Sequence, residues 1–189
     1  MNYVIIIELS ILIVMILVKA VLLRRNGIAA FKIEKPDKNA IMLVFIIVCF
    51  VYAALSGALG LPFPSIAGRP FWQINIFRIF AVLICTVSLI WMGISLIIFG
   101  NSFRIGIDEK TNAQLIRSGT FAISRNPVFL AFITFFLGIF LMYSNMITLT
   151  FLILLVFMVH RQILREEKFL KNHYGKEYED YCAKVKRYI

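Results

Sequence analysis

Residues 74–99, INIFRIFAVLICTVSLIWMGISLIIF, form an apolar block that carries one charged side chain, Arg78. A helix needs about 20 apolar residues to cross the hydrocarbon core of a bilayer, so this block is long enough to span it. Tyr3–Leu23 and Ala40–Leu61 are blocks of the same kind earlier in the chain. Together the three blocks predict an all-α membrane protein.

Two further apolar blocks, Pro127–Tyr143 and Met146–His160, lie close to the lower length limit for a span. We expect a polytopic bundle of about five transmembrane helices, with four as the alternative. Continuation of the last helix beyond His160 would restore its length. We predict a single membrane domain, with three transmembrane helices in residues 1–99 and a cofactor loop, a helical hairpin and cytosolic C-terminal helices in residues 100–189.

The net charge of +10 is concentrated in three segments. Of the 20 Lys and Arg, five lie in residues 24–39, four in residues 100–126 and eight from Arg161 onward. The positive-inside rule places these segments in the cytosol and the N-terminus outside. We therefore expect a multi-pass protein of a prokaryotic plasma membrane whose basic residues contact membrane lipids, and no nucleic-acid partner. The three cysteines have no metal-binding spacing, so no metal is predicted.

Arg125-Asn126-Pro127 stands at the start of the fourth apolar block, after a long polar segment that begins at Gly100. Proline is favoured at the first position of a helix, and Asn is a good N-cap. The same geometry directs free backbone N–H groups toward the cytosolic side, where Arg125 would help them to bind a carboxylate or a phosphate. A plain helix start and an anion site both fit this motif.

A second polar feature is Glu166-Glu167, within a helix predicted over Arg161–Tyr174. At 100° per residue, an apolar stripe runs through Ile163 and Leu170, and the two glutamates flank it. They should therefore face the protein, where a carboxylate needs a cationic ligand or a buried arginine as partner.

Gly175 is a typical C-cap for this helix, and Glu177–Lys186 then predicts a short second helix. The chain has no Walker-type or Rossmann glycine loop, no nucleophile elbow and no His-rich metal cluster. The length of the chain by itself excludes a soluble-type nucleotide-binding fold.

From about Gly100 onward the sequence resembles the isoprenylcysteine carboxyl methyltransferase family, membrane enzymes related to phospholipid methyltransferases. The likeness rests on four motifs in a shared order and spacing, whereas the first hundred residues match only as generic membrane helices. The motifs are Leu115-Ile116-Arg117-Ser118-Gly119-Thr120-Phe121, Arg125-Asn126-Pro127-Val128-Phe129, Arg165-Glu166-Glu167 and Tyr174-Gly175-Lys176-Glu177-Tyr178-Glu179-Asp180-Tyr181.

This resemblance implies S-adenosylmethionine as methyl donor, held on the cytosolic side beneath the loop and the tail. Residues of the loop would line the adenosine pocket, residues at the start of the fourth span would bound the methionine end, and Glu166 would face the donor's ammonium group. The donor-binding residues so implied are Gln114, Leu115, Ile116, Phe121, Arg125, Asn126, Pro127, Phe129 and Glu166.

The resemblance also implies an arginine that holds a substrate carboxylate, for which Arg161 is the first candidate and Arg165 the alternative. Asn126 stands where the family commonly has His, and an amide cannot act as a base. A carboxylate acceptor needs no base, so we expect carboxyl O-methylation of an isoprenylcysteine-like or lipidic acid. The alternative is N-methylation of a phospholipid amine, in which Glu167 or His160 would accept the proton.

Two other classes of protein function remain compatible with the sequence. One is an NADPH-dependent membrane reductase, which shares a similar arrangement of C-terminal helices. The other is a non-catalytic lipid-binding membrane protein that keeps the scaffold. In the leading interpretation the partners are a lipophilic small-molecule or prenylated substrate and membrane lipids.

Overall fold

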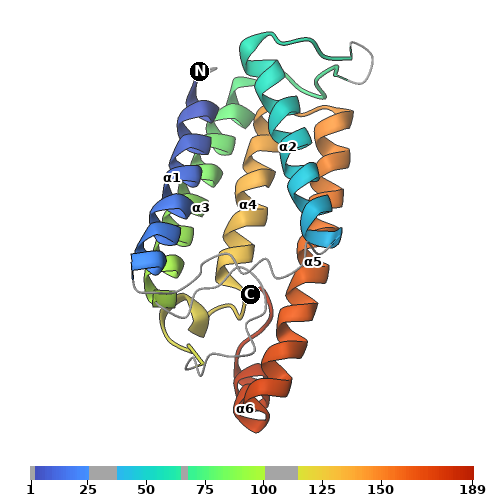
Figure 1. The fold of residues 1–189 in the computed structure, drawn as a ribbon. Helices are drawn as coiled ribbons and strands as arrows, with labels where there is room; N and C mark the ends of the chain where they lie inside the picture. The colour runs from blue at the N-terminus through green and yellow to red at the C-terminus, as the bar shows by residue number, and fades with distance from the viewer. Residues whose placement is uncertain (1–2, 26–37, 65–67, 101–114) are drawn as a thin grey trace.

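The computed structural model describes residues 3–25, 38–64, 68–100 and 115–189, and its described elements are all helical. Figure 1 shows the helices as a bundle, with α6 at one end below α5. In chain order they are α1 (Val4–Arg25), α2 (Lys38–Leu59), α3 (Asn75–Phe99), the 3-10 turn η2 (Gly119–Ala122), α4 (Pro127–Met142), α5 (Met146–Tyr174) and α6 (Lys176–Lys184). The predicted polytopic helical bundle is confirmed.

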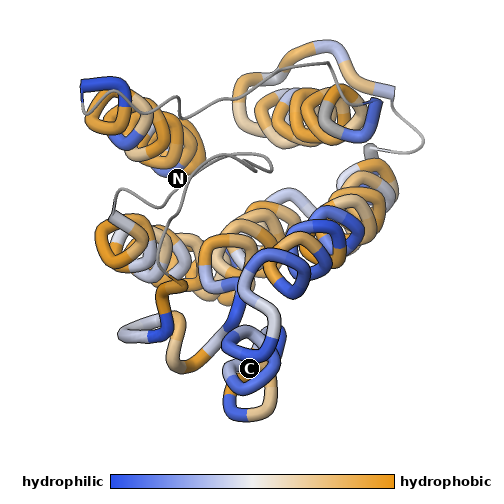
Figure 2. Tube along the Cα trace, turned by 60° about the horizontal axis from the view of Figure 1, so that its bottom comes forward, coloured by the Kyte–Doolittle hydropathy of each residue, from blue (hydrophilic) through white to orange (hydrophobic). Residues whose placement is uncertain are grey.

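The helices alternate in direction. In Figure 1, α1, α3 and α5 run downward, whereas α2 and α4 run upward. We call the end where α1 and α3 finish and where α2 and α4 begin the lower end. Viewed from there in Figure 2, α3, α4 and α5 form one layer, with α1 packed on α3 and α2 packed on α5.

Four helices, α1, α2, α3 and α5, are long and apolar enough to cross a membrane. The fifth apolar helix, α4, has only 16 residues and lies between α3 and α5. At 1.5 Å per residue it is about 24 Å long, which is less than the roughly 30 Å of bilayer hydrocarbon. The five predicted apolar helices are thus present, and the fourth is the short one.

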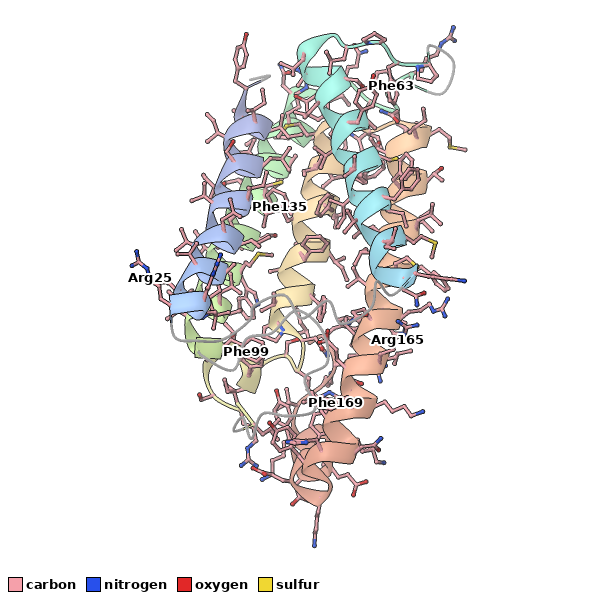
Figure 3. The ribbon with its side chains drawn as sticks, in the orientation of Figure 1. Arg25, Phe63, Phe99, Phe135, Arg165 and Phe169 are labelled. Carbon is pink, nitrogen blue, oxygen red and sulfur yellow. The ribbon has the colours of Figure 1, made fainter. Side chains whose placement is uncertain are left out.

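Helix α5 continues without a break through the region where a separate tail helix was expected. Its 29 residues correspond to about 43 Å, so the turns after His160 extend beyond the hydrocarbon layer. Figure 2 shows this lower half and α6 as the most hydrophilic part of the bundle. Figure 3 places Arg165 and Phe169 there, below Phe135 in the middle of the bundle.

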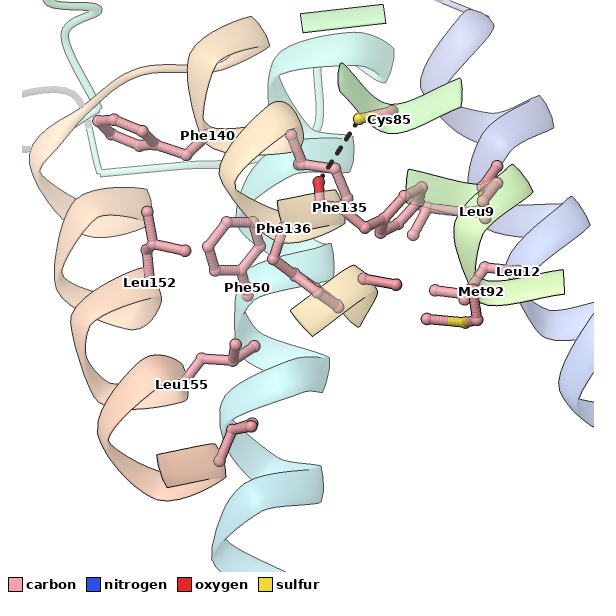
Figure 4. Close-up of a cluster of buried hydrophobic side chains, with 14 of the residues drawn as sticks. Leu9, Leu12, Phe50, Cys85, Met92, Phe135, Phe136, Phe140, Leu152 and Leu155 are labelled. Carbon is pink, nitrogen blue, oxygen red and sulfur yellow. Dashed lines mark hydrogen bonds between the residues drawn. The ribbon is translucent and has the colours of Figure 1, made fainter. Parts of the chain in front are cut away.

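Small residues allow α3 and α4 to pack closely. A Cβ added to Gly138 of α4 would overlap the Cys85 sulfur and approach the carbonyl oxygen of Ala81 to 3.1 Å. The Cys85 Sγ lies 3.4 Å from the Phe135 carbonyl oxygen and donates to it, as Figure 4 shows. Small side chains serve the same purpose at other membrane helix interfaces, where close backbone approach replaces the hydrophobic effect.

Polar side chains of α1 also bind α3. The Lys19 Nζ donates to the carbonyl oxygens of Leu96 and Gly100, both at 2.7 Å, and so caps the C-terminal end of α3. Near the other end, Glu8 is buried and accepts a 3.1 Å hydrogen bond from the Thr86 hydroxyl. The Lys19 bonds hold the foot of α3, beside the candidate site, in a defined position, and the Glu8 bond joins the two helices nearer their other end.

Candidate functional site

Three segments meet at the lower end of the bundle. They are the segment 115–126 that precedes α4, the lower half of α5, and α6 with the tail that follows it, residues 185–189. Figure 1 shows the tail rising from α6 back to the foot of α4. The Arg125 backbone N–H donates to the Lys186 carbonyl oxygen at 3.0 Å, which joins the first segment to the tail.

Glu167 lies at the centre of this junction and is buried. Its Oε2 accepts hydrogen bonds from the Arg187 guanidinium, at 2.9 Å from Nε and 2.8 Å from an Nη atom. Its Oε1 lies 3.3 Å from an Arg125 Nη atom and accepts a 3.1 Å hydrogen bond from the Asn126 amide. The carboxylate of Glu167, on α5, therefore binds two guanidinium groups and an amide that come from two other segments, so the buried negative charge is paired and hydrogen-bonded.

Asn126 occupies the N-cap position of α4, but its side chain makes no capping hydrogen bond there. Asn126 thus holds the expected N-cap position without the side-chain bond that often accompanies it. Its amide nitrogen donates to Glu167 at 3.1 Å and to the Arg187 carbonyl oxygen at 3.3 Å. The charge of the carboxylate strengthens the first of these bonds, which fixes the orientation of the side chain. Pro127 does begin the helix, as predicted.

Phe121, in the turn η2, anchors the segment before α4. Its ring stacks on Phe99 at the foot of α3, with centroids 4.9 Å apart, and its carbonyl oxygen accepts a 2.6 Å hydrogen bond from the Tyr181 hydroxyl of α6. Aromatic stacking and this bond together hold one wall of the site between α3 and α6.

Gly119 starts that turn with a φ of +61°, and a Cβ there would overlap the Ile98 side chain. Replacing it by alanine should cost about 1–2 kcal/mol, because a left-handed conformation disfavours any Cβ. We expect Gly119→Ala to lower the thermal midpoint by several degrees and also to weaken binding of the methyl donor that the sequence resemblance implies, because Phe121 would be displaced.

Gly60 is the matched control for this substitution. Its φ is +68°, but no atom lies within 4 Å of an added Cβ, and it sits at the end of α2 opposite the site. Gly60→Ala should therefore lose similar stability and keep donor binding. Equal donor binding in both variants would contradict the assigned role of Gly119.

Glu166 is half-buried and accepts a 2.9 Å hydrogen bond from the Gln162 amide. Among the residues that the structure describes, no lysine or arginine pairs with it. Burial raises the pKa of this carboxyl group to about 7, although the Gln162 hydrogen bond opposes the shift. A positively charged ligand beside this carboxyl group would favour its ionised form, because opposite charges attract strongly in a partly buried site.

Three buried hydrogen-bonding atoms near this junction have no partner within the described part of the chain. They belong to the segment before α4 and to α6, and are Thr120 Oγ1, Arg125 Nε and Tyr178 Oη. A buried polar atom without a hydrogen-bond partner destabilises the folded protein, so we expect a ligand or a water molecule to bind each of these atoms. The same part of the molecule thus offers donors for oxygen atoms and one carboxyl group for a cation.

The remaining predicted residues take different positions. Leu115, Ile116 and Phe129 are half-buried, and Gln114 lies outside the described residues. Arg161 is exposed on α5, with its guanidinium 5.8 Å from the centre of the Phe157 ring. Six residues separate Arg161 from Glu167, which is about 120° away around the helix, so Arg161 is not part of the Glu167 cluster.

Sequence reasoning missed Arg187, which binds Glu167, and Gln162, which binds Glu166. Gln162 stands four residues before Glu166, a spacing that could have indicated the pair. Arg187 follows a predicted helix with no periodic pattern, so nothing local in the sequence indicated its partner.

Residues 75–177, just over half of the chain, match the phospholipid methyltransferase family. The chain belongs to this family. The match confirms the expected group of membrane methyltransferases, related to the isoprenylcysteine carboxyl methyltransferases. It covers α3, the segment before α4, α4 and α5, but ends before most of α6 and the tail. A search of curated proteins finds no match.

Within the described residues, no group of three His, Cys, Asp or Glu side chains is placed to hold a metal ion.

Proposed function

We propose that this membrane methyltransferase uses S-adenosylmethionine and methylates a lipophilic acceptor at the lower end of the bundle, which faces the cytosol. The observation that carries the proposal is Glu166, a half-buried carboxyl inside the family-matched segment that pairs with no lysine or arginine among the described residues. An α-ammonium group is a suitable partner for such a side chain, and the donor carries one.

The residues present fit the other groups of the donor. The unsatisfied Arg125 Nε and Thr120 Oγ1 supply donors for carboxylate or hydroxyl oxygens, and Tyr178 Oη can donate or accept. Phe121, stacked on Phe99, offers an aromatic surface at the foot of α3 for an adenine ring. When bound, the donor supplies a methyl group activated by its sulfonium.

In the reaction, the protein holds the methyl donor and orients it toward the nucleophile. Glu166 would fix the ammonium end, while the Glu167 cluster fixes Asn126 and Arg125 relative to α5. Alignment of donor and nucleophile in a site that excludes water is worth several orders of magnitude in rate. An acceptor with a lipid chain would approach from the bilayer, along the apolar upper parts of α4 and α5.

The nature of the acceptor separates two chemistries. Carboxyl O-methylation of an isoprenylcysteine-like acid requires no base, and Arg161 or Arg165 would hold the carboxylate. N-methylation of a phospholipid amine requires a proton acceptor.

The deciding experiment uses the purified full chain in vesicles that contain a lipid extract, with donor labelled in its methyl group. We expect label to enter the lipid fraction, and we expect S-adenosylhomocysteine, but not NADPH, to protect the protein against thermal unfolding. Protection by NADPH alone would support the reductase alternative. No protection and no labelled lipid would overturn the proposal and leave a non-catalytic lipid-binding protein.

A further inference from the structure

His160 and Tyr188 form a close pair beside the site. The His160 Nδ1 and the Tyr188 hydroxyl oxygen are 2.6 Å apart, and both side chains are half-buried. The other ring nitrogen of His160, Nε2, makes no hydrogen bond to the residues that the structure describes. When His160 carries its proton on Nδ1, this N–H donates to the Tyr188 hydroxyl oxygen and Nε2 keeps a free lone pair.

The pair lies between the Glu167 cluster and the bilayer. His160 is seven residues before Glu167, so both side chains are on the same face of α5 and are separated by about 10 Å along its axis. His160 also ends the apolar part of the helix. A lipid headgroup that enters from the membrane would therefore reach His160 before it reaches Glu167.

The tail is held in place by contacts independent of this pair. Arg187 binds Glu167, and its carbonyl oxygen accepts hydrogen bonds from Ser124 at 3.2 Å and from Asn126 at 3.3 Å. Tyr188 is the next residue, so these bonds fix its backbone against α5. Residues 185–189 lie beyond the family-matched segment, and the pair therefore belongs to a part of this chain that the match does not cover.

Other groups near the junction are poorly suited to accept a proton. Both oxygens of Glu167 already accept hydrogen bonds from Arg187 and Asn126, with Arg125 beside them. The Asn126 amide has no basic lone pair. Glu166 would be occupied by the ammonium group of the donor.

We propose that His160, positioned by Tyr188, is the proton acceptor for methylation of an amine headgroup. The inference rests on the proposed function and assigns its acceptor class. The His160 Nε2 takes one proton from the alkylammonium headgroup, which leaves a neutral amine and an imidazolium. The amine nitrogen lone pair then forms the new N–CH₃ bond as the S–CH₃ bond of the donor breaks, and the electron pair of that bond stays on sulfur. The imidazolium returns its proton to water.

The step matters because a primary alkylammonium, with a pKa near that of lysine at about 10.4, is almost wholly protonated at pH 7 and cannot attack. General base catalysis contributes roughly 10²- to 10⁴-fold when the base is well placed. Among the described residues, the charged groups on the elements around the pair include Arg161, Arg165, Glu166 and Glu167 on α5, Lys186 and Arg187 on the tail, Arg125 before α4 and Lys38 on α2. All the variants used below retain these charges, so a changed pH profile reports on the pair.

The test compares His160→Gln and Tyr188→Phe with the wild-type chain in vesicles of phosphatidylethanolamine, using methyl-labelled S-adenosylmethionine from pH 6 to pH 9.5. His173→Gln is the matched control, since His173 is the other histidine of the chain, is exposed on the same helix and stacks on Phe169. A second acceptor, a farnesylated cysteine with a free carboxylate, is assayed in parallel.

We expect His160→Gln to lower kcat for the amine about 100-fold at pH 7, with a smaller loss as pH rises and the free amine accumulates. Tyr188→Phe should lower it about tenfold, and His173→Gln should change little. Binding of S-adenosylhomocysteine should be the same in all four proteins. A loss in His160→Gln that is independent of pH, or no loss, would overturn the role of His160.

The proposed function can fail separately. If the wild-type chain methylates the carboxylate and not the amine, the inference is wrong and the donor assignment stands. If it binds no donor and labels neither acceptor, the proposed function itself is wrong.

Discussion

Replacing Glu166 by glutamine is expected to weaken the binding of S-adenosylmethionine about 100-fold. The substitution keeps the shape of the side chain and its contact with Gln162, but it removes the charge that the ammonium group of the donor would pair with. A charge-assisted hydrogen bond in a partly buried site is worth roughly 1.5–3 kcal/mol, which corresponds to a factor of about 10 to 150. Calorimetry on the purified full chain with S-adenosylhomocysteine measures the change directly.

The matched control is Glu179→Gln. Glu179 lies on α6 and is exposed, with its carboxylate 3.0 Å from the Lys171 Nζ. Its loss should leave donor binding within twofold of the wild type, because an exposed ion pair contributes little. Undiminished binding in Glu166→Gln, with the protein folded, would count against the donor assignment.

The pKa of Glu166 adds a pH dependence to the same measurement. Burial raises that pKa from 4.5 to about 7, so near neutrality about half of the ligand-free protein carries a neutral Glu166. Binding of an ammonium group requires the ionised form, hence affinity should fall as pH drops through 7. Between pH 7.5 and pH 6 the expected weakening is roughly eightfold, and it should be absent in Glu166→Gln.

The raised pKa of Glu166 also makes the free energy of unfolding depend on pH. For most carboxyl groups the contribution to stability grows as pH rises, whereas for Glu166 it decreases. The folded protein binds the Glu166 proton more tightly than the unfolded chain, so this group stabilises the fold below pH 4.5. That contribution is lost as pH rises through about 7. The window from 4.5 to 7 is therefore where Glu166→Gln should flatten the pH dependence of the thermal midpoint.

Replacing Glu167 by alanine is expected to destabilise the folded protein by about 2–4 kcal/mol. The change removes the common partner of Arg125 and Arg187, leaves two guanidinium groups close together, and takes one of its two hydrogen-bond acceptors from the Asn126 amide. The unpaired charge of Arg125 costs more free energy than that of Arg187, because water reaches it less. The side chain of Arg125 is 13% exposed and that of Arg187 is 35% exposed. The thermal midpoint of the detergent-solubilised protein is the measurement.

A charge-balanced double variant distinguishes a structural role of Glu167 from a direct chemical one. Glu167→Met combined with Arg187→Met removes one positive and one negative charge, so stability should recover most of what Glu167→Met alone loses. Donor binding should recover with it. If stability stays at wild-type level in Glu167→Ala, the carboxylate does not hold the three segments together.

Much of the fold follows from local sequence. The apolar blocks predicted the five long helices because each backbone polar group must be satisfied inside a helix when lipid is the solvent. Pro127 and Gly175 marked a helix start and a helix end correctly, since both act through their own backbone geometry. The burial of Glu167 also followed from helical periodicity, because the stripe beside it is apolar.

What local sequence did not contain is the pairing between distant residues. Asn126 occupies the N-cap position of α4, yet its side-chain amide donates to the carboxylate of Glu167 and makes no capping hydrogen bond. Arg161 stands near the glutamates in sequence but points outward, whereas Arg187, twenty residues after Glu167, binds it.

The sequence by itself thus determined a membrane methyltransferase built of apolar helices, with its polar motifs at one end. The tertiary structure decided which of the two glutamates is paired with arginines of the protein, and this pairing is the basis for proposing Glu166 as the ligand-binding one. The physical reason is that a buried carboxylate takes the nearest cations the fold brings to it. Only the return of the tail to the foot of α4 brings Arg187 to Glu167 and leaves Glu166 without such a partner among the described residues.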